Sequence, residues 1–211
     1  MGGVKHVLLL IAVVMGQSAL AADKKDPMQS AIIEKAIRSE LKKLEGELTK
    51  ADFEKVRKLN LDVSSADRFR ASARMKEAGL KELAKLTRLE SLRLHGNQLT
   101  DVSALVRLPR LTLLHLGNNR LTDVSPLAGL TQLKKLYLSH NRLTDVSPLA
   151  KLTQLESLYL RNNQLSNVSV LMGLTKLTHL DLGDNPSLSK AGIDKLQKAL
   201  PKCKISHNTK K

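Results

Sequence analysis

The sequence predicts an α/β fold in which copies of one short unit stack into a curved solenoid, with parallel strands along one face and short turns along the other. Two observations support this prediction. The string LTDVSPLA occurs at 121–128 and again, letter for letter, 22 positions later at 143–150, with related strings at 99–106 and 165–172. A second pattern, L-x-x-L-x-L-x-x-N, occurs five times in the same register. The chain is therefore expected to repeat one structural unit.

Each copy of the second pattern is expected to contain a strand. In LESLRLHGN (89–97), Leu92 and Leu94 face inward and alternate with outward-facing residues, as strand geometry requires. Neighbouring copies should pair as parallel strands about 4.8 Å apart. The other four copies are LTLLHLGNN (111–119), LKKLYLSHN (133–141), LESLYLRNN (155–163) and LTHLDLGDN (177–185).

The five consecutive copies within 89–185 closely resemble the leucine-rich repeat family. The 22-residue period and the L-T-D-V-S-P-L tail resemble the short-repeat class found in bacterial internalins and in a eukaryotic phosphatase regulator. The resemblance implies a leucine-rich-repeat solenoid, a right-handed horseshoe with its strands on the concave face. It also implies protein binding, whereas adhesion to host cells is not carried over, because no cell-wall sorting tail or membrane anchor is visible.

One asparagine in each copy lies where the chain turns away from the strand. A buried amide both donates and accepts hydrogen bonds, so it can satisfy backbone groups of neighbouring coils. The resemblance implies that these residues form an asparagine ladder, and we interpret them as structural rather than as ligands. They are Asn97, Asn119, Asn141, Asn163 and Asn185.

The repeated octapeptide is interpreted as the convex return of each coil. In 121–128, the apolar residues Leu121, Val124 and Leu127 are three positions apart, which suits a 3₁₀ turn. Pro126 favours the start of a turn and blocks a long helix. The Asp123 carboxylate can cap the turn that follows.

Residues 23–55 are expected to form a helical N-terminal cap. Asp26 and Pro27, followed by Gln29, have the pattern of a helix start. Apolar residues then recur at helical spacing, and a second start follows at 49–52. The stretch 33–62 resembles the helical cap of internalin-like proteins. The apolar positions of the first helix are Ile33, Ile37, Leu41 and Leu44.

The repeats are expected to occupy 56–188, with an insertion in the first one. Val56 aligns with Leu89, so the first copy is longer than the regular period of the later copies. The extra residues lie within 64–79, where we expect a basic helix that ends at Gly79. The insertion is either a tolerated convex element or a binding protrusion.

The C-terminal cap is expected at 189–205. Ser189 begins a helix whose apolar side carries Ile193, Leu196 and Leu200, and a proline follows it. Residues 202–205 alternate like a final edge strand with Cys203 buried. Residues 206–211 should form a tail.

Residues 1–22 have the pattern of a secretory signal peptide. Lys5 precedes an apolar run at 7–15, and 19–21 is a small-x-small cleavage site. This apolar run is too short to span a bilayer, so no transmembrane segment is expected in the mature chain. The single cysteine, Cys203, allows no internal disulfide. We expect a bacterial protein that is exported to the periplasm or secreted, and a monomer.

The formal net charge is +15, and the surplus lies towards the ends of the chain. Residues 185–211 hold seven Lys and one Asp, a net of +6, whereas 89–184 carry a net of only +3. A basic end can attract an anionic envelope polymer or a membrane surface. The other interpretation is a solvated cap that aids solubility. Nucleic-acid binding is not expected, because export and the mixed charge of the concave face argue against it.

The outward strand positions form the candidate binding surface for an unknown protein partner. Tyr and Arg dominate protein-interface hot spots, and both tyrosines of the chain occupy one column in adjacent copies. The alternative is that the tyrosines only stack as a cross-strand pair. The candidate partner-binding residues are Arg93, His95, Leu113, His115, Lys135, Tyr137, Tyr159, Arg161, His179 and Asp181.

Catalysis has little support in the sequence. No nucleophile, phosphate-loop or paired-cysteine motif occurs. The histidines have no metal spacing within one element, so His95, His115 and His179 are interpreted as polar surface rather than as a metal site. No cofactor and no enzymatic activity are expected.

Overall fold

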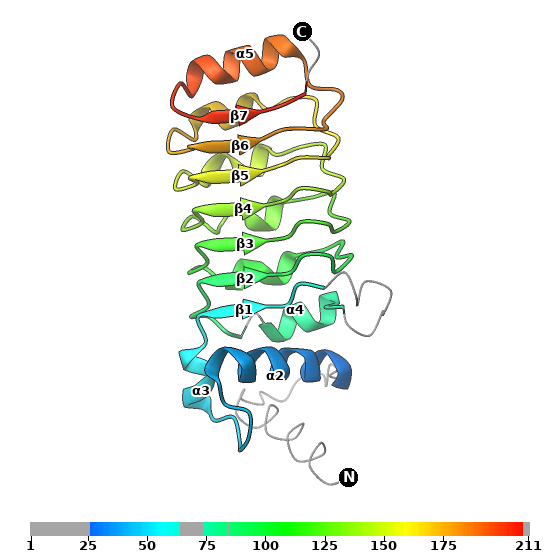
Figure 1. The fold of residues 1–211 in the computed structure, drawn as a ribbon, viewed down its shortest axis with the longest axis vertical. Coiled ribbons are helices and arrows are strands. Elements are labelled where there is room, and N and C mark those ends of the chain that lie inside the picture. The colour runs from blue at the N-terminus through cyan, green and yellow to red at the C-terminus, as the bar shows by residue number, and fades with distance from the viewer. Residues whose placement is uncertain (1–25, 64–73, 84, 209–211) are drawn as a thin grey trace.

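A computed structural model describes residues 26–63, 74–83 and 85–208. Seven parallel strands form one sheet in chain order, and successive strands climb from one end of the stack to the other (Figure 1). This arrangement confirms the predicted leucine-rich-repeat solenoid. The strands are β1 (Lys58–Asn60), β2 (Ser91–Arg93), β3 (Leu113–His115), β4 (Lys135–Tyr137), β5 (Ser157–Tyr159), β6 (His179–Asp181) and β7 (Lys204–Ser206).

The register of the sheet follows the repeat. Leu92 pairs with Leu114, and the same step continues from strand to strand as far as β6. Between β1 and β2 the step is longer, since Leu59 pairs with Leu92. The predicted alignment of the first repeat is therefore correct. In-register pairing places equivalent residues of successive copies side by side across the sheet.

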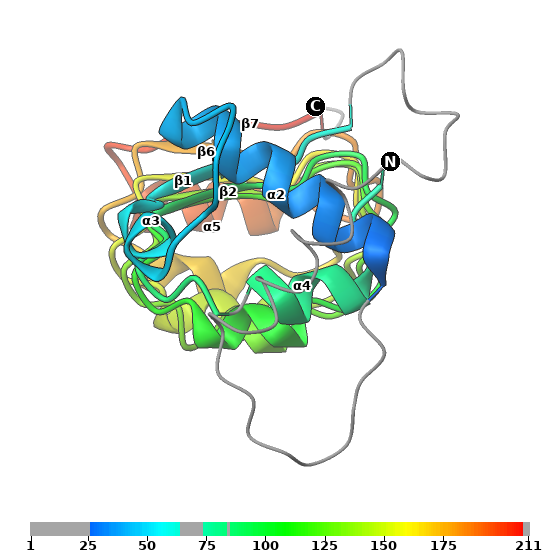
Figure 2. The ribbon, with the colours of Figure 1, turned by 90° about the horizontal axis from the view of Figure 1, so that it is seen from below.

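The returns lie on the side of the stack opposite the sheet, as the view along the stack shows (Figure 2). Each is a 3₁₀ helix, as predicted, because apolar residues three positions apart face the core. Asp123 holds the turn as expected, since its carboxylate accepts from both the backbone N–H and the hydroxyl of Ser125. The 3₁₀ helices are η2 (Ser103–Arg107), η3 (Ser125–Leu127), η4 (Ser147–Lys151) and η5 (Ser169–Gly173).

The core between these two sides is built mainly from leucine. Within the central repeats, every leucine of the L-x-x-L-x-L frame is fully buried, as are Leu121, Val124 and Leu127 in the return. Burying a leucine side chain contributes roughly 1.5 to 3 kcal/mol. A single coil has no closed core of its own, so this contribution depends on the neighbouring coils.

The repeat asparagines join adjacent coils through buried hydrogen bonds. Asn119 accepts from the backbone N–H of Leu99 at 2.9 Å through Oδ1. Its Nδ2 donates to the carbonyls of Leu94 and Leu116 at 3.0 and 2.9 Å. Asn97, Asn141, Asn163 and Asn185 are likewise buried and donate to backbone carbonyls.

A left-handed residue next to each of these asparagines makes the sharp turn. The φ angle is +55° at Asn118, +58° at His140, +53° at Asn162 and +53° at Asp184. Asn, Asp and His tolerate this conformation better than most non-glycine residues. The turn therefore accounts for the polar residue that precedes the last four ladder asparagines.

Helices α2 (Pro27–Leu41) and α3 (Lys50–Lys55) cover the N-terminal end (Figure 1). Asp26 caps α2 and a capping box involving Thr49 begins α3, as predicted. The prediction for Leu44 is wrong: α2 ends at Leu41, with Lys42 in the left-handed conformation, and Leu44 is 81% exposed.

Gln29 also differs from its expected capping role. Its side chain is buried and binds the C-terminal part of the first repeat's insertion. Oε1 accepts from the backbone N–H of Lys76 at 2.7 Å, and Nε2 donates to the carbonyl of Arg74 at 3.0 Å. Gln29 therefore fixes α2 to the chain just before α4 (Glu77–Leu83).

The helix expected to end at Gly79 is not placed as predicted. Helix α4 begins at Glu77 and continues through Gly79 to Leu83. Gly79 is buried because it lies in close contact with Met75 and Gln29, so its lack of a side chain serves packing rather than helix termination. The rest of the predicted insertion, 64–73, lies outside the described residues.

The C-terminal end is closed by α5 (Lys190–Ala199) and β7. Ser189 caps the helix, and Ile193, Leu196 and Leu200 face the core as predicted. Cys203 is buried with a free thiol, and Ile205 packs partly buried against the core. No helix in the described ranges is long and apolar enough to cross a membrane. The predicted signal peptide lies outside them.

Candidate functional site

The sheet presents one continuous row of outward side chains, which we call the central column. The register aligns Arg93 of β2 with His115, Tyr137, Tyr159 and Asp181 of the next four strands. Asn60 of β1 precedes them, and Ser206 of β7 follows. These side chains project from the open face of the sheet, because their neighbours along each strand are the buried leucines.

Four rings lie in contact along this face. His95 lies 5.0 Å from His115, His115 lies 4.9 Å from Tyr137 in an edge-on arrangement, and Tyr137 lies 4.6 Å from Tyr159, all measured between ring centroids. We call these four residues the ring row. Gly117 makes room for it, since a Cβ there would lie 3.1 Å from His115 Nε2 and 3.2 Å from His95 Nδ1.

The two tyrosines form the cross-strand pair considered from the sequence. Their planes differ by only 4°, so each ring face is turned towards its neighbour along the stack. Both residues are half-buried. A partner approaching the sheet would therefore meet ring edges and hydroxyl groups rather than open ring faces. Within the described residues, neither hydroxyl has a hydrogen-bond partner.

Asp62 organises the end of the ring row next to β1. Its carboxylate contacts Arg93 Nε at 2.7 Å and the backbone N–H of His95 at 2.7 Å, and it lies 3.8 Å from His115 Nδ1. Burial alone would raise the pKa of Asp62, but the interactions with His115, His95 and Arg93 outweigh it and lower the pKa to about 2. Burial, and then the nearby His115, lower the pKa of His95. This corner therefore holds a carboxylate that stays charged and a histidine that favours its neutral form.

A second ion pair lies beyond the tyrosines. Arg161 contacts Asp184 at 2.7 Å, and Asp184 also accepts from the Asn208 side chain at 2.7 Å. Asp181 accepts from the backbone N–H of Gly183 at 3.0 Å, which fixes its carboxylate beside this pair. The ring row is thus bounded by an Arg–Asp pair at each end.

The other flank of the central column is mixed. It carries Leu113, which is half-buried, and Lys135, which is exposed and makes no ion pair among the described residues. His179 is exposed, and its Nδ1 lies 2.9 Å from the hydroxyl of Thr178. A partner could therefore bury an apolar side chain beside a cation here.

All ten residues predicted for the surface lie on this one face, but their surroundings differ. Arg93 and Arg161 are held by carboxylates, and both partners of these pairs were missed as site residues. Asp62 could have been found because it lies in the flanking position of the first repeat. Asp184 gave no such signal, because it belongs to the left-handed turn and reaches back to the face.

A metal site at His95, His115 and His179 is not formed. β3 and β6 are three strands apart, roughly 14 Å at 4.8 Å per strand. No group of three His, Cys, Asp or Glu residues in the described ranges could hold a metal ion.

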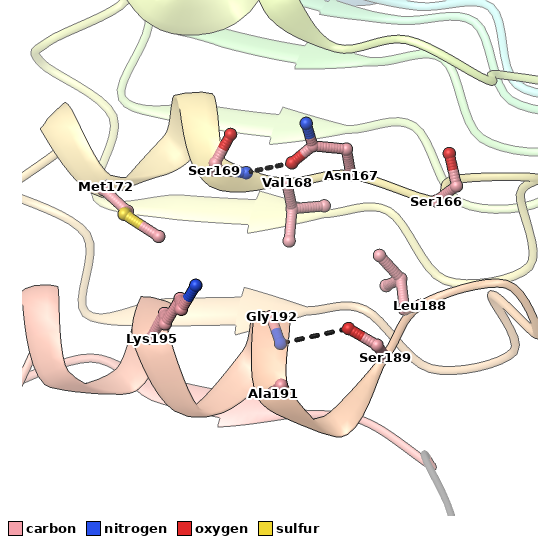
Figure 3. Close-up of a pocket in the computed structure, with 10 residues that line it drawn as sticks. All are labelled: Ser166, Asn167, Val168, Ser169, Met172, Leu188, Ser189, Ala191, Gly192 and Lys195. Atoms are coloured by element: carbon pink, nitrogen blue, oxygen red, sulfur yellow. Dashed lines mark hydrogen bonds between the residues drawn. The ribbon is translucent and has the colours of Figure 1, made fainter.

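A cavity of about 330 Å³ lies on another side of the molecule, between η5 and α5 (Figure 3). Two of its polar side chains bind the backbone: Asn167 accepts from the N–H of Ser169, and Ser189 accepts from that of Gly192. Among the described residues that line it, Lys195 is the only ionisable one, so no carboxylate or histidine borders the cavity.

Comparison with known families gives one match. The sequence matches the family described as Leucine Rich repeats (2 copies) at 87–129, 109–151, 131–171 and 153–198. The matched segments overlap and cover more than half of the chain. No curated protein matches the chain in sequence.

Several solved structures are similar to this one. An internalin of Listeria monocytogenes, InlF, has a TM-score of 0.62 and 27% identity over 89% of this chain and 59% of its own length. A leucine-rich repeat protein of Leptospira interrogans has a TM-score of 0.56 and 34% identity over 60% of this chain and 33% of its own length. Internalin C2 of Listeria monocytogenes, at 22% identity, shares the fold with a TM-score of 0.58 over 90% of this chain and all of its own. The chain thus spans less than two thirds of the first two proteins.

Proposed function

Since the chain belongs to the leucine-rich repeat family and has internalin-like short repeats, we propose that it is a non-catalytic module that binds a partner protein on the open face of its sheet. The observation that carries this proposal is the ring row bounded by two Arg–Asp pairs. Aromatic residues and arginine at the centre of a face are the usual hot spots of protein interfaces.

The arrangement of the ring row favours a protein partner over a small ligand. The two tyrosines stack with their planes 4° apart, and tyrosine side chains bury much area with few torsions while keeping a polar tip. On binding, each of the two tyrosine hydroxyls can replace its hydrogen bond to water with one to the backbone of the partner. Arg93 and Arg161 are already oriented by Asp62 and Asp184, so less side-chain entropy is lost on binding.

Export remains part of the proposal and rests on the sequence. Residues 1–22 have the charged start, apolar run and cleavage site of a secretory signal. We place the mature protein in the periplasm or outside a bacterial cell, where its partner would be another envelope or extracellular protein. The partners of the longer structural neighbours are not transferred to this chain.

The test is capture of a partner from native extract by the immobilised mature protein, identified by mass spectrometry, and then affinity measurement with variants. Tyr137→Ala combined with Tyr159→Ala should weaken binding about 1,000-fold, given hot-spot costs of about 2 kcal/mol per residue. Val106→Ala is the matched control, because Val106 is an exposed apolar residue in η2 on the opposite side. Its affinity should not change.

A second variant guards against a folding defect in the tyrosine variants. Lys135→Glu reverses an exposed charge beside the ring row and leaves the core unchanged. Unchanged affinity in both the double tyrosine variant and Lys135→Glu, with native circular dichroism, would overturn the proposal.

A further inference from the structure

The C-terminal end of the stack carries an unbalanced positive charge. Five lysines of α5, β7 and the turn between them are exposed, and the one carboxylate among them is Asp194. None of these lysines makes an ion pair or a side-chain hydrogen bond within the described part of the chain. We call them the cap lysines: Lys190, Lys195, Lys198, Lys202 and Lys204.

The opposite end shows that a cap of this solenoid does not require such charge. Residues 26–55 carry six Lys or Arg and seven Asp or Glu, a net of −1, whereas 185–208 carry five Lys and one Asp, a net of +4. Several N-terminal cations are paired, for example Arg38 with Glu34 at 2.8 Å and Lys43 with Asp52 at 2.7 Å. Mutual repulsion of the cap lysines opposes folding slightly, so packing does not explain them.

Their position makes the C-terminal end of the molecule cationic, with Lys195 beside the cavity between η5 and α5 and Lys204 in register with His179 at the edge of the open face. Helix α5 turns Ile193, Leu196 and Leu200 towards the repeats, so its outer side faces away from the stack. Figure 1 shows α5 and β7 at the end of the stack opposite α2. A broad anionic surface could therefore contact several cap lysines at once.

We propose that this end docks on an anionic lipid bilayer. A bilayer supplies many mobile headgroup charges, which can match cations spread over a helix and a strand without a cleft for each charge. The cavity beside α5 is bordered by only one of them, Lys195. The large exposed apolar residues in the described ranges are Met28, Leu44 and Val106, all outside this cap. The contact is therefore electrostatic and peripheral, without insertion.

Docking by this end leaves the ring row free, because Lys204, the cap lysine in register with His179, lies on β7, two strands beyond Tyr159. The strands run across the long axis of the stack, so the open face of the sheet lies at its side rather than at its end (Figure 1). In a protein held by its cap lysines, the long axis of the stack would stand along the bilayer normal. The ring row would then face the aqueous phase on the side of the stack. The proposed bilayer docking therefore does not depend on the protein partner, and it would still hold if no protein partner bound the ring row.

The experiment measures binding of the mature protein to vesicles by co-sedimentation. Vesicles of phosphatidylcholine with 30 mol% phosphatidylglycerol are compared with phosphatidylcholine alone. We expect binding only to the anionic vesicles, and a fall of about tenfold or more between 50 and 300 mM NaCl, since screening shortens the reach of the charges. Absent binding, or binding unaffected by salt, would overturn the proposal.

Two variants, each with four lysines replaced by neutral glutamine, test which end of the protein contacts the bilayer. Replacing Lys190, Lys195, Lys198 and Lys202 with Gln should lower the partition coefficient about 600-fold, at about fivefold per lysine. Replacing Lys35, Lys42, Lys50 and Lys58, four exposed lysines near the other end, with Gln should change it less than tenfold. Equal losses in both variants would show a net-charge effect and refute a cap site. Binding to the soluble polyanion heparin without vesicle binding would also refute it, in favour of a polymer.

Discussion

Asn141→Ala tests the account of how one coil is joined to the next. The side chain accepts from the backbone N–H of Leu121 at 3.0 Å, and Nδ2 donates to the carbonyls of Leu116 and Leu138 at 3.0 and 2.9 Å. All of these contacts are buried. The substitution removes these three hydrogen bonds, together with a longer, partly buried one from Nδ2 to the Ser139 carbonyl at 3.5 Å, and leaves the neighbouring backbone in place.

The three losses are not equivalent. Within the described residues, Leu121 N–H has no other acceptor, and an unsatisfied buried donor costs about 1 to 3 kcal/mol. The Leu116 carbonyl still accepts from Asn119 and the Leu138 carbonyl from Asn163. Each of these two losses is therefore a single net hydrogen bond of about 0.5 to 1.5 kcal/mol. Together they predict a decrease of about 2 to 6 kcal/mol in the free energy of unfolding.

Urea unfolding followed by far-ultraviolet circular dichroism measures this decrease. Gln164→Ala is the control, because Gln164 is exposed and its side chain has no hydrogen bond within the described residues. It should shift the free energy of unfolding by less than about 0.5 kcal/mol. A decrease of less than about 1 kcal/mol for Asn141→Ala would refute the ladder as a source of stability.

Three further predictions follow from single residues. Asp62→Asn should destabilise the protein by about 2 kcal/mol at pH 7, because the pKa of Asp62 falls from 3.8 to about 2 on folding. That stabilisation is present above about pH 4 and lost as the pH falls through 2, so a difference in stability between wild type and variant that stays constant from pH 6 to pH 2 would contradict it. Gly79→Ala should lower the melting temperature despite the better helix propensity of alanine, since the new Cβ would lie 2.6 Å from Gln29 Oε1 and crowd the buried Met75; a higher melting temperature would contradict this packing. Cys203 should react with a thiol reagent only after unfolding, because it is 4% exposed and burial raises its pKa, and rapid labelling of the native protein would contradict this.

The sequence predicted the repeat region well, because residues one period apart in the sequence occupy equivalent places in neighbouring coils. Once Leu92, Leu114 and Leu136 are known to be equivalent, parallel in-register pairing places their outward neighbours in columns. Caps were predicted from local chemistry, such as Asp26 before Pro27 and Ser189 before α5, since a capping hydrogen bond involves only nearby residues.

Features that depend on distant contacts were not predictable. Asp62 contacts Arg93 only because the longer first repeat still pairs in register with the second. The repeat pattern in the sequence does not show which rotamers bring this carboxylate and this guanidinium together. Gly79 was interpreted as a helix end because glycine often has that role, but here a close approach to Gln29 selects it. Leu44 followed helical spacing beyond the point where Lys42 ends the helix.

The central claim is that the partner lies against the ring row, and site-specific photo-crosslinking tests it most directly. A photo-reactive phenylalanine analogue at position 137 keeps an aromatic ring in the row, whereas the same analogue at position 106 lies in η2 on the opposite side. The account predicts a covalent adduct with the captured partner from position 137 and none from position 106. Adducts from 106 and none from 137 would place the partner on the returns and contradict the account.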